Sequence, residues 1–122
     1  MMLTSIPTTK MTRSEWLAER RKSIGGSDAA AVIGLSRFAS PYVVWLDKTG
    51  RLPDKGDTEA MRLGRDLEAY VAKRFEDDSG KKVRKCNYII RNQAFPWAHA
   101  DIDRRIVGEN AGLECKTTST LD

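Results

Sequence analysis

The 122 residues carry 40% hydrophobic and 31% charged side chains, which is ordinary for a globular protein of one domain over residues 1–122. The formal net charge of +4 is compatible with a polyanion such as nucleic acid, although many basic proteins bind none. No apolar run approaches the roughly 20 residues of a membrane span, and Met1–Thr4 lacks the charged start of a secretory signal. We therefore expect a cytoplasmic protein without a membrane partner.

The first half of the chain predicts a loose arm over residues 1–11, followed by three helices. Capping signals and apolar spacing place these helices at residues 12–22, 28–34 and 41–49. Ser27 is the expected N-cap of the second helix. In the third helix, Tyr42, Trp45 and Leu46 form the expected buried side.

Two residues in this half could bind an anion. Arg20 lies on the last turn of the first helix, and Ser27 follows a glycine pair at a helix start, where free N–H groups attract phosphate. The alternatives are a solvated helix end for Arg20 and a plain N-cap for Ser27, with Asp28 competing for the same positive end. The residues alone favour these alternatives.

The fourth predicted helix runs from about Thr58 to Asp77. Its apolar stripe is formed by residues at helical spacing: Ala60, Gly64, Leu67, Val71 and Phe75. Glu68 lies against this stripe, and a partly buried carboxylate needs a partner, either a shared metal or a basic residue. The alternative is an edge glutamate that reaches water or pairs with Arg65.

The second half predicts strands. Val83–Arg91 reads as one strand whose basic start either follows a DNA backbone or protects a sheet edge. Residues 100–107 and 111–118 form a hairpin around Gly108-Glu109-Asn110. His99, the only histidine, is expected to be structural or exposed. Cys86 and Cys115 lack metal-ligand spacing and are expected to be free, partly buried thiols.

The hairpin parity brings three charged residues together. If Val107 faces Gly112, then Asp103 faces Lys116, and Glu114 shares their face. A register shift of two residues preserves this result, whereas a shift of one destroys it. The intervening side chains of Leu113, Cys115 and Thr117 are expected to point into the core.

Two carboxylates held this close repel each other unless a cation lies between them. Oxygen ligands favour Mg²⁺, with Mn²⁺ as the alternative, and a neighbouring lysine can orient or deprotonate a water. Asp103, Glu114 and Lys116 therefore indicate metal-assisted phosphodiester hydrolysis. The alternative is a solvated strand face on which Asp103 and Lys116 form a cross-strand ion pair.

The Asp103…Glu114-x-Lys116 pattern after a helix with Glu68 resembles the PD-(D/E)XK nuclease superfamily. Within it, five blocks in the same order resemble the YqaJ-type viral recombinase family, relatives of the phage lambda exonuclease. These blocks are residues 20–36, 45–50, 64–68, 100–104 and 112–118.

The resemblance implies an α/β (α+β) fold with a restriction-endonuclease-like core, a mixed β-sheet flanked by helices. It also implies C-terminal truncation, since the family pattern continues beyond residue 122. The implied function is metal-dependent exonuclease action on double-stranded DNA ends in phage or prophage recombination, in a bacterial or phage-infected cell. Implied partners are a single-strand annealing protein and, at full length, further copies of the chain. Alternatives are a non-catalytic DNA-binding module and a related endonuclease.

The resemblance also implies roles for individual residues. Asp103, Glu114 and the backbone carbonyl of Cys115 would hold Mg²⁺, while Lys116 would orient the attacking water. Glu68 would hold a metal or position its water. Two residues elsewhere, Arg20 and Ser27, would clamp a terminal phosphate. The chain departs from the pattern at Ile102, where the family has proline, and at Asp101, where relatives of lambda exonuclease carry a phosphate-binding serine.

Overall fold

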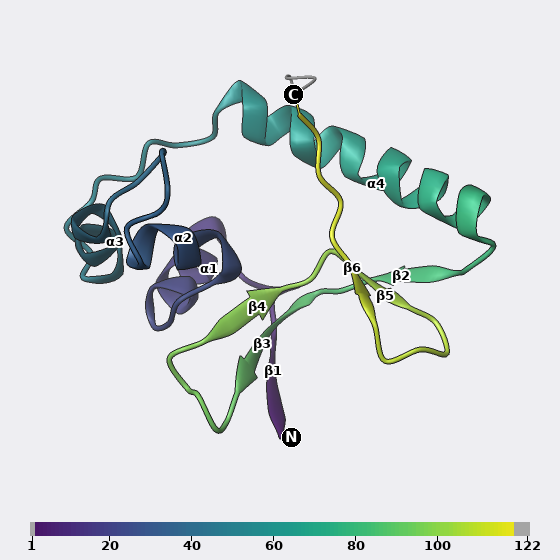
Figure 1. Cartoon of the computed structure of the whole chain (residues 1–122), viewed down its shortest axis with the longest axis horizontal. Coiled ribbons are helices and arrows are strands. Elements are labelled where there is room, and N and C mark those ends of the chain that lie inside the picture. The colour runs from purple at the N-terminus through teal and green to yellow at the C-terminus, as the bar shows by residue number, and fades with distance from the viewer. Residues whose placement is uncertain (1, 119–122) are drawn as a thin grey trace. The chain divides into compact units, whose positions relative to one another are not determined.

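The computed structural model describes residues 2–118, which form four helices and two small antiparallel sheets in a mixed α+β arrangement (Figure 1). The chain divides into two compact units. Unit 1 comprises the chain up to Asp54 together with Asn87–Asp101, and unit 2 comprises Lys55–Cys86 together with the chain from Ile102 onward. The single domain over residues 1–122 stays a prediction.

Three helices belong to unit 1: α1 (Arg13–Arg21), α2 (Gly26–Val32) and α3 (Pro41–Lys48). The predicted caps of α1 and α3 are confirmed, because Thr12 Oγ1 accepts from the Glu15 N–H at 3.2 Å and Ser40 Oγ accepts from the Val43 N–H at 3.2 Å.

The predicted cap of α2 is wrong. Gly25 is the N-cap, and Ser27 lies inside the first turn as an exposed residue. The Asp28 carboxylate accepts from the Gly25 N–H at 2.9 Å, so the longer acidic side chain reaches back over the helix start. The predicted buried side of α3 is also wrong, because Val44 is buried whereas Tyr42 and Trp45 are exposed and stack on each other.

The sheet of unit 1 has the order β1-β3-β4, formed by β1 (Leu3–Pro7), β3 (Tyr88–Asn92) and β4 (His99–Asp101). Leu3–Pro7 pairs antiparallel with Tyr88–Asn92, so the prediction of a loose arm over residues 1–11 is wrong. β1 is an edge strand, where proline is tolerated, and its hydrogen-bonding partner lies far away in the sequence.

Unit 2 contains the long helix α4 (Glu59–Ser79) and a sheet of order β2-β5-β6, formed by β2 (Val83–Lys85), β5 (Arg104–Ile106) and β6 (Gly112–Leu113). Thr58 caps α4, and left-handed Gly80 ends it, two residues beyond the predicted end. The predicted stripe is half-buried from Gly64 to Phe75, with Ala72 fully covered, whereas Ala60 is exposed.

The predicted long strands are broken where the chain passes between the units. Val83–Arg91 divides into β2 and β3, because the Cys86 N–H donates to the Asp103 carbonyl whereas the Asn87 carbonyl accepts from Thr8. The strand predicted at residues 100–107 divides into β4 and β5, and the one predicted at 111–118 is paired only at Gly112–Leu113. Instead of one mixed sheet, residues 2–118 therefore form two antiparallel sheets, with one parallel bridge between Ile24 and Ala98.

The cores of both units are small. Ala31, Val44 and Ile89 are buried in unit 1, and Ala72 and Ile106 in unit 2. Both cysteines are free and half-buried, as predicted. Within residues 2–118, no helix combines the length and the apolar character needed to cross a bilayer.

Candidate active site and phosphate-binding residues

Asp103 immediately precedes β5 in unit 2 and is held from two sides. Its Oδ2 atom accepts a hydrogen bond from the backbone N–H of Cys115 at 2.7 Å. Its backbone carbonyl accepts from the Cys86 N–H at 3.1 Å. These bonds fix the half-buried Asp103 carboxylate beside the chain that follows β6.

Glu114 and Lys116 follow β6 and lie in contact, with Lys116 Nζ 2.9 Å from Glu114 Oε1. The observed register places Arg105 opposite Gly112, two residues from the predicted pairing, and such a shift preserves the predicted parity. The alternation of half-buried Leu113 and Cys115 with exposed Glu114 and Lys116 is confirmed. Thr117 is exposed, so its predicted core position is wrong.

The hydrogen bond from Lys116 to Glu114, followed by the charges of Glu114 and Asp103, raises the pKa of the Lys116 ammonium above its ordinary value. Lys116 is therefore protonated and acts as a donor near neutral pH. The predicted cross-strand ion pair with Asp103 is replaced by the pair with Glu114, while Asp103 remains close enough to act on Lys116 through its charge.

Glu68 on α4 pairs with Arg104 on β5, a residue that the sequence does not reveal as part of the site. Arg104 Nη1 also donates to the backbone carbonyl of Asp103 at 3.0 Å. Arg104 is 9% exposed, so a basic residue supplies the partner that a shielded Glu68 requires. The alternative partner, Arg65, binds Asp57 instead.

Cys115 reports the electrostatic environment of the site. Burial raises the pKa of its thiol, and the charges of Asp103, Glu68 and Glu114 raise it further, against the opposing charge of Arg104. The three carboxylates thus act on one common point in unit 2.

A divalent ion fits part of this donor set. Each described contact of Asp103 and Glu114 uses one carboxylate oxygen, so the second oxygen of each is the atom that a metal would take. Among residues 2–118, no three acidic, histidine or cysteine side chains lie close enough to hold an ion by themselves. Mg²⁺ is commonly bound by one or two carboxylates together with water and substrate phosphate, which matches Asp103 and Glu114. Glu68 would have to release Arg104 to join them.

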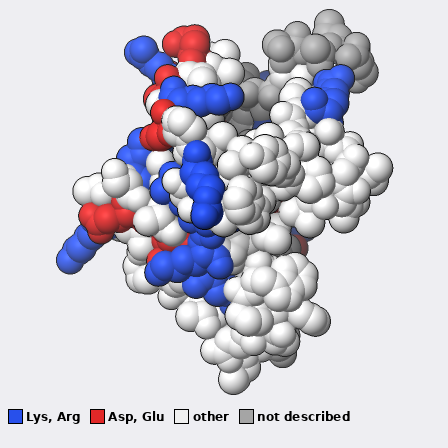
Figure 2. All heavy atoms as spheres, turned by 90° about the vertical axis from the view of Figure 1, so that its left-hand side faces the viewer, with Lys and Arg blue, Asp and Glu red and all other residues white. Residues whose placement is uncertain are grey.

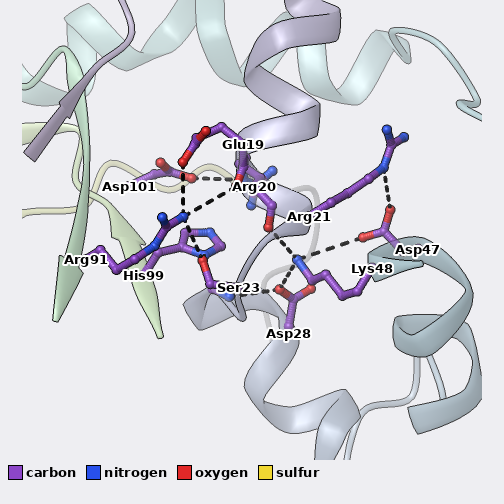
Figure 3. Close-up of polar contacts among 11 residues, drawn as sticks. Glu19, Arg20, Arg21, Ser23, Asp28, Asp47, Lys48, Arg91, His99 and Asp101 are labelled. Atoms are coloured by element: carbon purple, nitrogen blue, oxygen red, sulfur yellow. Dashed lines mark hydrogen bonds and ion pairs between the residues drawn. The ribbon is translucent and has the colours of Figure 1, made fainter. Parts of the chain in front are cut away.

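The residues predicted to bind phosphate belong to unit 1 (Figure 3). Arg20 Nε lies 2.9 Å from Asp101 Oδ2, and the Arg20 guanidinium covers the Trp16 ring at 4.7 Å. Ser27 is exposed on the first turn of α2. The structure therefore joins Arg20 to Asp101, the residue at the position where relatives of lambda exonuclease carry a serine.

The start of α2 is also neutralised from within the unit. Lys48 Nζ lies 2.9 Å from Asp28 Oδ2 and donates to the Arg20 carbonyl at 3.1 Å (Figure 3). Burial raises the pKa of Asp28, but the hydrogen bonds from Lys48 and the Gly25 N–H outweigh it and lower the pKa overall. An anion at this end would therefore meet an ionised carboxylate. Basic and acidic side chains are likewise interspersed on the face shown in Figure 2.

A buried polar chain supports this part of unit 1. His99 Nδ1 lies 2.8 Å from Ser23 Oγ, which accepts from Arg91 Nη2 at 3.2 Å, and Arg91 pairs with Glu19 at 3.3 Å (Figure 3). His99 is 7% exposed, and its burial lowers the pKa of the imidazole. His99 is therefore a neutral structural residue near neutral pH.

Comparison with known proteins follows the same blocks. Residues 15–121 match the family described as the YqaJ-like viral recombinase domain. The chain is similar to the uncharacterized protein YqaJ of Bacillus subtilis (strain 168), with 52% identity over 115 residues. That match covers 93% of this chain and 36% of the relative, so the chain spans little more than a third of the relative's length.

Proposed function

The chain belongs to the YqaJ-like viral recombinase domain family, and from this premise we propose that it is a metal-dependent deoxyribonuclease of phage or prophage recombination. It hydrolyses phosphodiesters from the end of duplex DNA and uses a restriction-endonuclease-like core. The observation that carries the proposal is the grouping in unit 2, where Asp103 is bonded to the Cys115 N–H beside the Glu114–Lys116 pair. These are the residue types that metal-assisted hydrolysis requires.

Each residue of unit 2 has a defined task. Asp103, Glu114 and the Cys115 carbonyl hold Mg²⁺ or Mn²⁺, which supplies Lewis-acid activation of the phosphate and of a water. Lys116 donates a hydrogen bond to that water, since its raised pKa keeps it protonated. Glu68 positions the water or completes the metal site after exchanging its bond with Arg104.

Arg20 and Ser27 clamp a terminal phosphate in this proposal, and a single-strand annealing protein receives the resected strand. Several copies of the whole protein assemble around DNA. Because Arg20 is bonded to Asp101, a phosphate must displace that carboxylate. Arg20→Ala should slow the cleavage of 5′-phosphorylated ends more than that of 5′-hydroxyl ends, and equal slowing of both would contradict the clamp.

The proposal is tested with linear duplex DNA in the presence of Mg²⁺ or Mn²⁺. The wild-type chain should release nucleotides, and Asp103→Ala should reduce the rate by about 10³-fold or more, since a metal ligand is lost. Asp78→Ala is the matched control, because Asp78 is an exposed carboxylate on α4 in a long-range pair with Arg74. Equal activity of the Asp103 and Asp78 variants would refute the assignment. Covalently closed circular DNA should remain intact, and its cleavage would indicate an endonuclease.

A non-catalytic DNA-binding module is the second candidate. The observation in its favour is that Glu68 is occupied by Arg104 and that residues 2–118 contain no group of three metal-binding side chains. A chain that shifts DNA in a gel but releases no nucleotides with either metal would establish this function instead.

A further inference from the structure

Two arginines lie directly opposite each other on the sheet of unit 2. Arg84 on β2 pairs with Arg105 on β5, and opposed residues in an antiparallel pair share a face. The flanking pair Val83–Ile106 points the other way, with Ile106 buried, so both arginines lie on the exposed face. Like charges at opposed positions repel, and an anion bound between them would remove this repulsion.

The two arginines line a hollow of about 500 Å³ that continues along the β5–β6 turn, Ile106–Asn110. Glu109 is an acidic residue of this lining, but Lys81 Nζ lies 2.9 Å from its Oε1 atom and 3.1 Å from its Oε2 atom. Lys81 therefore compensates the charge of Glu109, and the hollow keeps the positive charge of Arg84 and Arg105.

The hollow adjoins the candidate metal ligands along the same strand. Side chains alternate along β5, so Asp103 and Arg105 share a face and lie about 6–7 Å apart along the chain. The pairing of Arg105 with Gly112 places the next position on that face at Glu114. A polyanion bound at the carboxylates would thus present its next charged group to the arginines.

We infer that Arg84 and Arg105 bind a backbone phosphate of duplex DNA adjacent to the phosphate that is hydrolysed. This inference rests on the proposed function for the choice of DNA as the polyanion. Edge protection explains a charged residue on β2, which is an edge strand. It does not explain Arg105, which lies on the central strand β5. Arginine suits this task because its planar fork binds phosphate through two N–H groups.

The experiment measures binding apart from cleavage. The 122-residue chain is titrated onto a fluorescein-labelled blunt duplex in EDTA, and the dissociation constant is followed by anisotropy over a range of NaCl concentrations. Arg84→Ala and Arg105→Ala should each weaken binding about tenfold. Each should also lower the slope of log K against log[NaCl] by about 0.9, the value for one lost phosphate contact.

Lys85→Ala is the matched control, since it removes the same charge from β2 at an exposed position whose side chain points to the other face. Arg84→Lys keeps the charge and should retain most of the slope. Slopes of both arginine variants equal to that of Lys85→Ala, with far-UV circular dichroism unchanged, would overturn the inference. Wild-type binding with the predicted slope changes but without hydrolysis in Mg²⁺ would support the phosphate site while refuting the nuclease.

Discussion

Replacing Arg104 should destabilise unit 2 more than any single exposed ion pair. In Arg104→Ala, the Glu68 carboxylate remains on a half-buried face of α4 without its cation, and Asp103 loses a donor to its carbonyl. The side chains of Arg104 and Glu68 are 11% and 25% exposed.

The magnitude follows from this partial burial. Breaking a fully buried ion pair costs about 3–5 kcal/mol, whereas an exposed pair contributes about 0–1 kcal/mol. For the intermediate exposure of Glu68 and Arg104, we expect Arg104→Ala to lower the free energy of unfolding by about 2–3 kcal/mol. The coupling energy in a double-mutant cycle with Glu68→Ala should be about 1.5–2 kcal/mol.

Urea unfolding followed by far-UV circular dichroism measures the effect, because the longest helix, α4, belongs to unit 2. All three tryptophans, Trp16, Trp45 and Trp97, lie in unit 1, so their fluorescence reports that unit separately. A coupling energy below about 0.5 kcal/mol would refute the reasoning. It would attribute the loss to packing of the Arg104 aliphatic stem and not to its charge.

Three further outcomes are expected. Gly25→Ala should destabilise unit 1 by about 1–3 kcal/mol, because the new Cβ would lie 2.8 Å from His99 Nε2. Gly26→Ala, with nothing within 4 Å, should change tryptophan-detected unfolding by less than about 0.5 kcal/mol, and equal effects would contradict this explanation. Since burial lowers the folded-state pKa of His99, the unfolded state binds more protons below about pH 6.5, so stability should fall as pH drops through that value; the same pH slope in His99→Gln would be the contrary result. Asp101→Asn should release Arg20 and raise the relative cleavage rate of 5′-phosphorylated ends, and an unchanged ratio would count against that coupling.

Local signals in the sequence predict the helix starts well, since a cap depends on residues three positions apart. Thr12, Ser40 and Thr58 all cap as expected. Ser27 fails because Asp28, one residue later, offers a longer acceptor to the same turn. β1 is missed because its hydrogen-bonding partners come from β3, and no local pattern reveals such a distant partner.

The candidate active site shows the same division. The parity of Asp103 and Glu114 survives a two-residue error in register, because the side-chain period of a strand is two. The need of Glu68 for a partner is readable from its position on the helical stripe. The identity of that partner as Arg104 depends on how α4 packs on the sheet, which helical spacing does not encode.

The pairing of β1 with β3 also has a consequence during synthesis on the ribosome. Leu3–Pro7 emerges early, but Tyr88–Asn92, which supplies its hydrogen bonds, is translated much later. The nascent chain must therefore keep an open strand from self-association while all of Lys55–Cys86 is made. We expect its yield in cells to depend on elongation speed and on chaperones that shield early segments.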